Sequence, residues 1–364
     1  MWPDRRLLDL VGVGLPIVQA PMAGATGTTM AIAVAEAGGL GSLPCATLDA
    51  AKARAELGVI RQRMARPINV NFFCHVAPEP DAAREAAWKA RLAGYYVELG
   101  LDPTASAPAV NRAPFDEAMC AVVEDFKPEV VSFHFGLPAP ALIARVKAAG
   151  CLLMSSATTV AEARWLEDRG CDAIIAQGFE AGGHRGVFLT DTIATQAGTF
   201  ALVPQVVDAV KVPVIAAGGI ADGRGIAAAF ALGAAGAQVG TAYLFTPEST
   251  ITAMHRAALH AARDDQTALT NLFTGRPARG LINRLMREIG PLSDAAPAFP
   301  TAGGALAPLK LKAEAAGSAD FSSLWSGQSA RLGRAMGAGE LTRLLADEAA
   351  ERLAALGSTR RAGT

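Results

Sequence analysis

Short apolar runs alternate along the chain with longer, Ala-rich amphipathic stretches. Eight of these runs have the length and composition of buried strands, and they cover residues 17–20, 40–43, 68–73, 130–133, 152–155, 173–177, 214–217 and 237–240. Strands that alternate with helices favour a parallel sheet covered by helices. Eight such units predict an α/β fold of the TIM (β/α)8 barrel type. A doubly wound sheet is disfavoured, because no Gly-x-Gly-x-x-Gly turn follows the first strand.

Two segments do not fit this repeat. Residues 76–113 hold several prolines around a polar helix and are too long for an ordinary connection, so we expect an inserted lid segment there. Residues 264–364 contain helical patterns and a Pro/Gly-rich connector at 291–308, which predicts a smaller, mainly helical lid domain over the barrel mouth. The barrel would then occupy residues 1–263, and residues 357–364 would form a disordered tail.

Charge and composition narrow the function. The chain of 364 residues has 33 basic and 34 acidic residues and a net charge of -1, which disfavours a nucleic-acid binder and favours a small-molecule ligand. Its longest uncharged stretch, 225–247, is broken by glycines and fits a helix followed by a buried strand better than a membrane span. The charged amino terminus lacks the pattern of a signal peptide, so we expect a cytoplasmic protein without membrane contact.

The five cysteines do not indicate a metal or disulfide site. They are scattered, and none forms a Cys-x-x-Cys arrangement, so we expect buried free thiols. Cys74 and His75 are adjacent, but no second pair of ligand types lies nearby. No bound metal is therefore expected.

Glycines at the ends of the last two predicted strands suggest a phosphate site. Catalytic and binding groups of a TIM barrel lie at the carboxyl ends of its strands. Glycine there lets backbone N–H groups approach an anion, and the following helix start adds a favourable dipole. Paired glycines can also mark tight packing alone. The residues concerned are Gly218, Gly219, Gln238, Val239, Gly240 and Thr241.

Other strand ends carry groups that suit a flat heteroaromatic ring. Met22 offers its backbone edge, and Asn71 and Gln177 offer amides, although each amide alone could simply satisfy a neighbouring loop. Together with a phosphate site, they predict flavin mononucleotide (FMN).

The histidines differ in their promise as catalytic groups. His184 follows Gly182 and Gly183 in what we expect to be a free loop, which makes it the catalytic candidate. His134 ends a strand and would either line the same site or be a satisfied core residue. His255 and His260 are expected on the surface of a helix. For Glu180 we expect a helix-capping or loop-bracing role.

Eight motifs follow one another along nearly the whole chain. They are Gln19-Ala-Pro-Met-Ala-Gly, Gly38-Gly-Leu-Gly, Asn69-Val-Asn71, Val131-Ser-Phe-His-Phe-Gly136, Glu180-Ala-Gly-Gly-His184, Ala217-Gly-Gly-Ile220, Gln238-Val-Gly-Thr241 and Trp325-Ser-Gly-Gln328. In this order they resemble the nitronate monooxygenase family, formerly called 2-nitropropane dioxygenases. The resemblance implies an FMN-containing TIM barrel that oxidises alkyl nitronates, such as propionate 3-nitronate, with O2 to a carbonyl compound and nitrite.

The same resemblance assigns roles to residues. Asn71, Gln177, Gly182, Gly219 and the run from Gln238 to Thr241 become flavin contacts, and His184 becomes the catalytic histidine. It also implies that neither a metal nor a nicotinamide is needed. The chain departs from the family near its carboxyl end, where Phe299 and the pair Lys310 and Lys312 occur without a clear tyrosine. Substrate preference therefore stays open.

Two other functions remain open. The FMN-dependent enoyl-acyl-carrier-protein reductases, which take hydride from NAD(P)H, share the barrel glycines and the Gly-Gly-His loop. The long carboxyl-terminal extension with Trp325-Ser-Gly-Gln328 favours the nitronate function. A non-catalytic flavin-binding barrel is the third alternative. The expected partners are a nitronate and O2, and a homodimer is left open.

Overall fold

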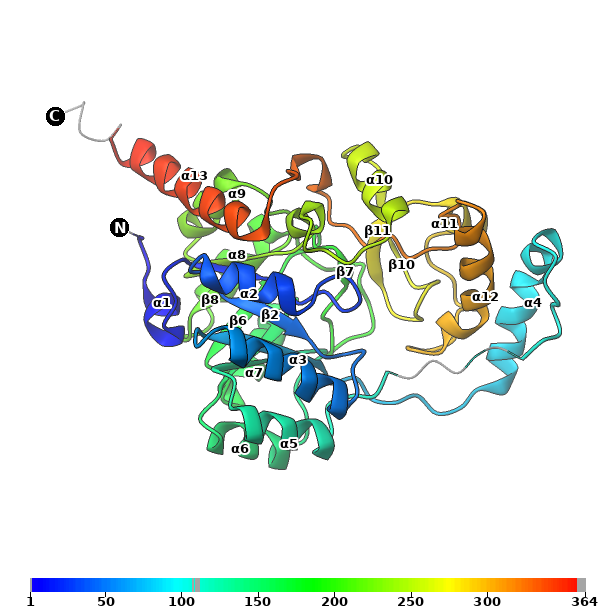
Figure 1. Cartoon of the computed structure of the whole chain (residues 1–364), viewed down its shortest axis with the longest axis horizontal. Coiled ribbons are helices and arrows are strands. Elements are labelled where there is room, and N and C mark those ends of the chain that lie inside the picture. The colour runs from blue at the N-terminus through cyan, green and yellow to red at the C-terminus, as the bar shows by residue number, and fades with distance from the viewer. Residues whose placement is uncertain (1, 107, 109–111, 359–364) are drawn as a thin grey trace.

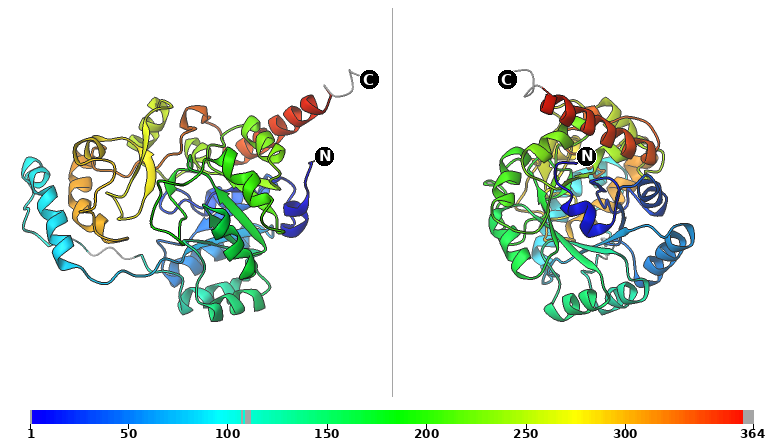
Figure 2. Two further views of the ribbon diagram at one scale, coloured as in Figure 1. Left: turned by 180° about the vertical axis from the view of Figure 1, so that it is seen from behind. Right: turned by 90° about the vertical axis from the view of Figure 1, so that its left-hand side faces the viewer.

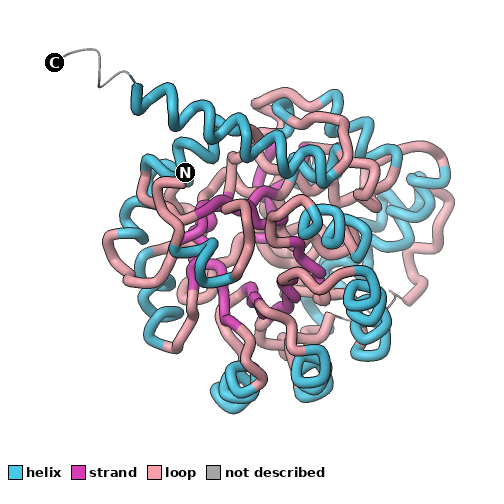
Figure 3. Tube along the Cα trace, turned by 60° about the vertical axis from the view of Figure 1, so that its left-hand side comes forward, coloured by secondary structure: helices cyan, strands magenta, loops and turns pink. Residues whose placement is uncertain are grey.

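Eight parallel strands form a closed barrel in the computed structural model, which describes residues 2–106, 108 and 112–358. The strands are β1 (Ile17–Gln19), β2 (Gly41–Pro44), β3 (Ile68–Phe73), β4 (Val130–His134), β5 (Leu152–Ala157), β6 (Ala173–Gln177), β8 (Val214–Ala217) and β9 (Gly236–Val239). They run in the order β1-β9-β8-β6-β5-β4-β3-β2, and a bridge between Val18 and Leu40 closes the ring (Figure 3). The predicted TIM barrel is confirmed, with every strand within two residues of its predicted position.

Helices cover the outside of this barrel and one end of it. The outer helices are α2 (Thr28–Glu36), α3 (Ala50–Arg63), α5 (Glu117–Phe126), α6 (Pro140–Ala148), α7 (Val160–Asp168), α8 (Thr199–Val207) and α9 (Gly223–Ala231). Several begin at an Asp or Thr whose side chain accepts from a first-turn N–H, as Asp49 and Asp116 do. Helix α1 (Arg6–Val11) packs Leu7 and Val11 against the apolar residues at the amino ends of the strands.

The last helix of the chain completes the barrel wall. Helix α13 (Ala338–Ser358) packs against α9 and α2, on the side of the molecule where both termini lie (Figures 1 and 2). Leu341, Leu345 and Ala349 are fully buried there. This placement differs from the expectation that the whole of 264–364 covers the mouth, because α13 has an apolar face that fills the eighth helix position. Gly357 and Ser358 end this helix, and the rest of the predicted tail, 359–364, lies outside the described residues.

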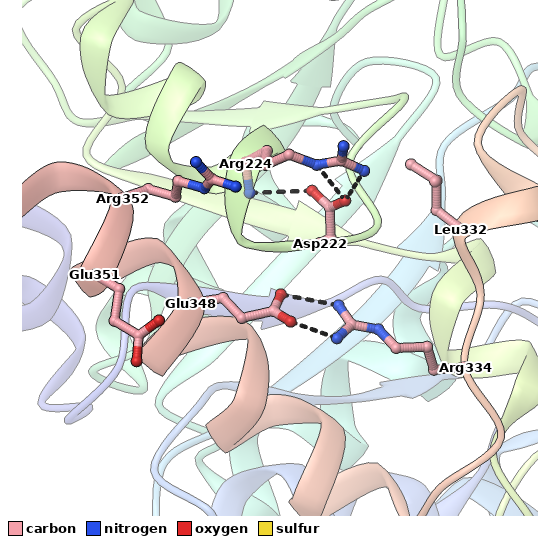
Figure 4. A pocket seen from close by; sticks show the side chains of 7 residues that line it. All are labelled: Asp222, Arg224, Leu332, Arg334, Glu348, Glu351 and Arg352. Atoms are coloured by element: carbon pink, nitrogen blue, oxygen red, sulfur yellow. Dashed lines mark hydrogen bonds and ion pairs between the residues drawn. The ribbon is translucent and has the colours of Figure 1, made fainter. Parts of the chain in front are cut away.

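A cluster of ion pairs fixes α13 to the barrel. Glu348 accepts two hydrogen bonds from Arg334 and a third, of 3.0 Å, from the backbone N–H of Gly223 at the start of α9. Figure 4 shows these groups around a surface cleft of about 490 Å³, beside the pair formed by Asp222 and Arg224. A side chain at position 223 is excluded, because its Cβ would lie 2.3 Å from the Cβ of Glu348.

The lid comprises two insertions, residues 74–114 after β3 and 246–337 after β9 and its short helix η1 (Thr241–Phe245). Its elements are α4 (Ala82–Glu98), α10 (Ala253–Ala261), β10 (Thr267–Thr270), β11 (Ala278–Leu281), α11 (Arg284–Ile289), α12 (Ala302–Ala315) and η2 (Ala330–Leu332). The lid lies at the end of the molecule away from the termini (Figure 1). Trp88 and Tyr96 of α4 donate to the carbonyls of Ala302 and Ala305 in α12, so the two insertions form one body with its own apolar core.

The lid is less helical than the sequence suggested. Strands β10 and β11 form an antiparallel sheet with β7 (Gly183–His184), a two-residue strand from the barrel's own sixth connection. Such short strands carry too little alternation to be recognised from the sequence. Helix α12 also begins inside the predicted connector 291–308 and continues through Pro308. Among the described helices, none has the length and apolar character needed to cross a membrane.

Candidate active site

A cavity of about 390 Å³ lies between the carboxyl ends of the barrel strands and the lid. The lid contributes His255, Lys310 and Trp325 to its wall. Almost all of the residues predicted from the sequence line this cavity, namely Met22, Asn71, Gln177, Gly182, His184, Gly218, Gly219, Gln238, Gly240 and Thr241. Val239 does not, because its side chain is fully buried within β9.

Two consecutive glycines form one corner of the cavity. Gly218 has φ +111° and Gly219 has φ +72°, a conformation that other residues rarely adopt. Thr199 Oγ1 lies 2.9 Å from the carbonyl oxygen of Gly218 and 2.8 Å from the carboxylate of Glu180, and its single hydrogen can be donated to either one. A Cβ on Gly218 would lie 2.9 Å from Thr199 Oγ1. Glu180 also accepts from the backbone N–H of Thr199, which caps α8 as predicted.

The Trp325-Ser-Gly-Gln328 motif crosses this glycine corner. The N–H of Gly327 donates to Thr241 Oγ1 at 2.9 Å, and the N–H of Gln328 donates to the carbonyl of Glu180 at 3.1 Å. A Cβ on Gly182 would lie 2.5 Å from the nitrogen of Gly327, so the two backbones can approach only because residue 182 is glycine. Thr241 accepts in this contact, and its own hydroxyl hydrogen stays available to a ligand.

The corner fits the phosphate-bearing chain of a flavin. Gln238 has a buried side-chain oxygen that no donor reaches among the described residues, although the residue lines the cavity. A buried acceptor of this kind needs a partner. Hydroxyl groups of a ligand would supply it, while the side-chain-free glycines 218, 219 and 240 leave room for a phosphate at the backbone.

The two predicted amides have different surroundings. Asn71 donates to the carbonyl and the hydroxyl of Ser132, at 3.2 and 2.9 Å, and its oxygen has no donor among the described residues. Gln177 uses both ends of its amide on the protein: Nε2 donates to the carbonyl of His184, and Oε1 accepts from the N–H of Gly186. Asn71 therefore has an acceptor to offer a ligand, whereas Gln177 mainly holds the segment that carries His184.

His184 lies in a strand, not in the free loop expected from the sequence. As part of β7 it pairs with Ala278 of β11. Its Nε2 is 2.9 Å from Thr274 Oγ1, and Thr274 in turn donates to the carbonyl of Arg276. Because that hydroxyl hydrogen is used, Thr274 accepts from Nε2–H, which leaves Nδ1 as the unprotonated nitrogen. The ring is surrounded by the aromatic side chains of Phe73, Phe135, Phe299 and Trp325.

Burial and nearby cations keep the cavity histidines neutral. Burial is the main cause that lowers the pKa of His184 well below its ordinary value, and the positive charge of Arg112 adds to it. Burial likewise lowers the pKa of His134 to about 4. His134 lines the cavity, with Nδ1 3.0 Å from Ser156 Oγ and Nε2 3.1 Å from the carbonyl of His184. It therefore shows features of both predicted roles, since it lines the cavity and both of its ring nitrogens are hydrogen-bonded.

The prediction for His255 was wrong. His255 is buried, lines the cavity and bonds through Nε2 to the carbonyl of Trp325 at 3.1 Å. Its helix pattern looked like a surface helix because the lid that covers it is formed by distant residues. His260 is exposed, as expected. Arg112 also lines the cavity and was missed, since an isolated arginine in a Pro-rich insertion carries no sequence signal.

The cysteines are free thiols. Cys45, Cys120, Cys151 and Cys171 are buried, as predicted, and Cys74 is partly buried. Burial raises the pKa of the Cys45 thiol to about 12, which keeps it protonated and unreactive. Within the described part of the chain, no three His, Cys, Asp or Glu side chains are grouped to hold a metal ion.

Residues 4–348 match the family described as nitronate monooxygenase. The chain belongs to the nitronate monooxygenase family. Members of this family are flavin-dependent oxidoreductases. The family predicted from the eight motifs is thereby confirmed, and so is its enzyme class.

Individual relatives agree with this membership. The chain is 43% identical to a nitronate monooxygenase of Paraburkholderia phytofirmans, over 94% of each chain. It is 41% identical to a nitronate monooxygenase of Pseudomonas aeruginosa, over 94% of this chain and 98% of that one. Among solved structures, a nitroalkane oxidase of Streptomyces ansochromogenes superposes with a TM-score of 0.87 at 43% identity, covering 96% of this chain and 99% of that chain.

The environment of His134 makes stability depend on pH. Its pKa is about 4 in the folded chain and about 6.5 when unfolded, so between these values the unfolded state binds more protons. The contribution of His134 is complete above about pH 6.5 and is lost as the pH falls toward 4. We therefore expect His134→Gln to lose less stability than the wild type over this range in urea unfolding. The other buried histidines are common to both proteins, so parallel pH profiles would contradict this origin.

Proposed function

We propose that this chain oxidises alkyl nitronates with molecular oxygen, to a carbonyl compound and nitrite, with FMN as its cofactor. One observation carries the proposal. A glycine corner suited to a phosphate and an uncharged histidine face the same cavity, in a chain whose relatives are named nitronate monooxygenases. The family name itself implies a nitronate substrate.

The cofactor contacts follow from the donors and acceptors that line the cavity. Gly218, Gly219, Gly240 and the Thr241 hydroxyl would hold the phosphate. The orphaned oxygen of Gln238 would accept from a hydroxyl of the ribityl chain. Asn71, Gln177, Gly182 and the Met22 backbone would border the ring system, with Val239 shaping the corner from within β9. When bound, FMN supplies an acceptor for the substrate's electrons and passes them to O2.

His184 has two tasks that depend on the form of the substrate. A neutral nitroalkane must first lose the proton on the carbon beside the nitro group, and the free Nδ1 lone pair of His184 can take it. The resulting imidazolium can then donate a hydrogen bond to the nitro oxygens. A preformed nitronate has already lost this proton. It therefore depends less on His184, whose neutral Nδ1 carries no proton to donate to it.

The source of electrons separates this function from that of a reductase. An anaerobic solution of the purified flavoprotein should be bleached rapidly by a nitronate and hardly at all by NADH, because the sequence has no adenine-dinucleotide fingerprint. Oxygen uptake and nitrite release with the nitronate complete the measurement. Fast reduction by micromolar NADH would overturn the proposal in favour of the reductase, and no reduction by either donor would favour a non-catalytic barrel.

Removing His184 should harm the two substrate forms unequally. We expect His184→Ala to lower kcat/KM by about 10²–10⁴ for a neutral nitroalkane, through loss of the base. A preformed nitronate needs no such base, so its kcat/KM should fall less. Steady-state oxygen uptake with each form measures both effects. Equal losses would leave His184 without a role as a base.

A charge placed at the glycine corner should expel the flavin. Gly219→Glu brings a carboxylate to the proposed phosphate site, and the two anions would repel each other. Gly219→Gln is its matched control, because it imposes the same side-chain size and the same backbone strain at φ +72°. We expect Gly219→Glu to purify with far less flavin than Gly219→Gln, as measured by absorbance per protein. A yellow Gly219→Glu protein with full flavin content would refute this placement.

A further inference from the structure

One guanidinium in the wall of the cavity has no counter-charge. Arg112 lies where the chain returns from the first lid insertion to the barrel, and it lines the cavity. Among the described residues, no carboxylate forms an ion pair with it, and no acceptor hydrogen-bonds its guanidinium. A partly buried cation without a partner is costly, and burial accordingly lowers the pKa of Arg112.

The charges around the cavity do not balance. Besides Arg112, one further basic side chain lines the cavity among the described residues, that of Lys310. Its Nζ lies 3.9 Å from Oε1 of Glu314. Among the described residues that line the cavity, Glu314 is the only one with a carboxylate. It also accepts a hydrogen bond from Ser322. The cavity histidines 134, 184 and 255 all have lowered pKa values. The wall therefore carries one uncompensated positive charge at neutral pH, and Arg112 holds it.

One aromatic ring, that of Phe299, is a neighbour of both Arg112 and His184. The Cζ of Arg112 lies 5.9 Å from the ring centroid of Phe299, and Phe299 packs edge-on against His184 with centroids 5.3 Å apart. The ring of His75 also packs edge-on against Phe299, with centroids 4.7 Å apart. Phe299 thus lies beside both groups, with Arg112 and His184 as separate polar contacts in one cavity.

We propose that Arg112 is a specificity residue that binds a carboxylate on the substrate, remote from the carbon that bears the nitro group. This inference rests on the proposed function for the identity of the reacting end. The planar guanidinium matches a carboxylate with paired N–H donors. A substrate whose nitro-bearing carbon lies at His184 would thus be selected for a second anion at the other end of a short carbon chain.

Arg112 is less suited to the flavin phosphate or to the nitronate group. The phosphate corner is formed by Gly218, Gly219 and Thr241, and the contacts of that corner are with Thr199, Glu180 and Gly327. Arg112 belongs to a different set of contacts, beside the ring of Phe299. If Arg112 instead bound the nitronate group itself, every nitronate would depend on it equally, which the following experiment distinguishes.

The test compares two nitronates that differ in one group. The nitronate of 3-nitropropionate ends in a carboxylate, and the nitronate of 1-nitropropane ends in a methyl group. For Arg112→Gln, we expect kcat/KM to fall by about 10- to 100-fold with the first substrate, through KM, because a hydrogen-bonded ion pair is lost. The second substrate should change by less than about 3-fold. Arg112→Lys should restore part of the loss.

A control and a binding measurement complete the design. Arg164→Gln removes a positive charge from the exposed surface of α7 and should leave both substrates unaffected. Propionate, followed by its perturbation of the flavin spectrum, should bind the wild type about 10-fold or more tightly than Arg112→Gln. Equal losses with both nitronates, or equal propionate binding, would overturn the assignment. A wild type that binds propionate through Arg112 but oxidises no nitronate would contradict the proposed function and keep the carboxylate site.

Discussion

The buried amide of Gln177 connects the barrel to the lid. Its two ends must both be satisfied inside the protein, and they are satisfied by the backbone of residues 184 and 186. These two hydrogen bonds hold residues 183–184 in the extended conformation that pairs with β11. Gln177, at the end of β6, therefore fixes one edge of the small lid sheet. The position of His184 follows from this constraint. Its ring is oriented by Thr274 of the lid, while its carbonyl is fixed by Gln177 and His134 of the barrel.

Arginines near this connection supply positive charge without carboxylate partners. Arg185 is fully buried and donates to the carbonyls of Gln177 and Gly178, and Arg279 donates to the carbonyl of Phe179. These contacts satisfy the backbone acceptors at the end of β6. Burial is the main cause that lowers the pKa of His134, and the charge of Arg185 adds to it, so a residue that braces the loop also helps to keep a cavity histidine neutral.

The sequence predicted the strands of the barrel and the residues at their carboxyl ends, because periodicity and strand position determine both. Asn69 and Asn71 lie two residues apart on β3, and both side chains are buried. Only Asn71 lines the cavity, whereas Asn69 donates to the hydroxyl of Ser42 on β2. The apolar pattern predicted the strand β3, but it did not predict which of the two asparagines reaches the cavity, because that depends on how β3 is paired with its neighbours. His255 and Arg112 could not be placed, because each faces the cavity only after two distant insertions have packed together. The short strand β7 was missed because its conformation is imposed by Gln177 and β11 instead of by local preference.

The division of the cavity between barrel and insertions has a functional consequence. The glycine corner and the amides come from connections that the barrel itself requires, whereas Arg112 comes from the first insertion and His255 and Lys310 come from the second. Substitutions in the insertions can therefore change the substrate-facing wall while the strands and their glycines stay in place. Because the insertions share an apolar core through Trp88 and Tyr96, one packed body carries this wall. On the proposed function, a substrate in this cavity would contact Arg112 of the lid and the cofactor held by the barrel's glycine corner.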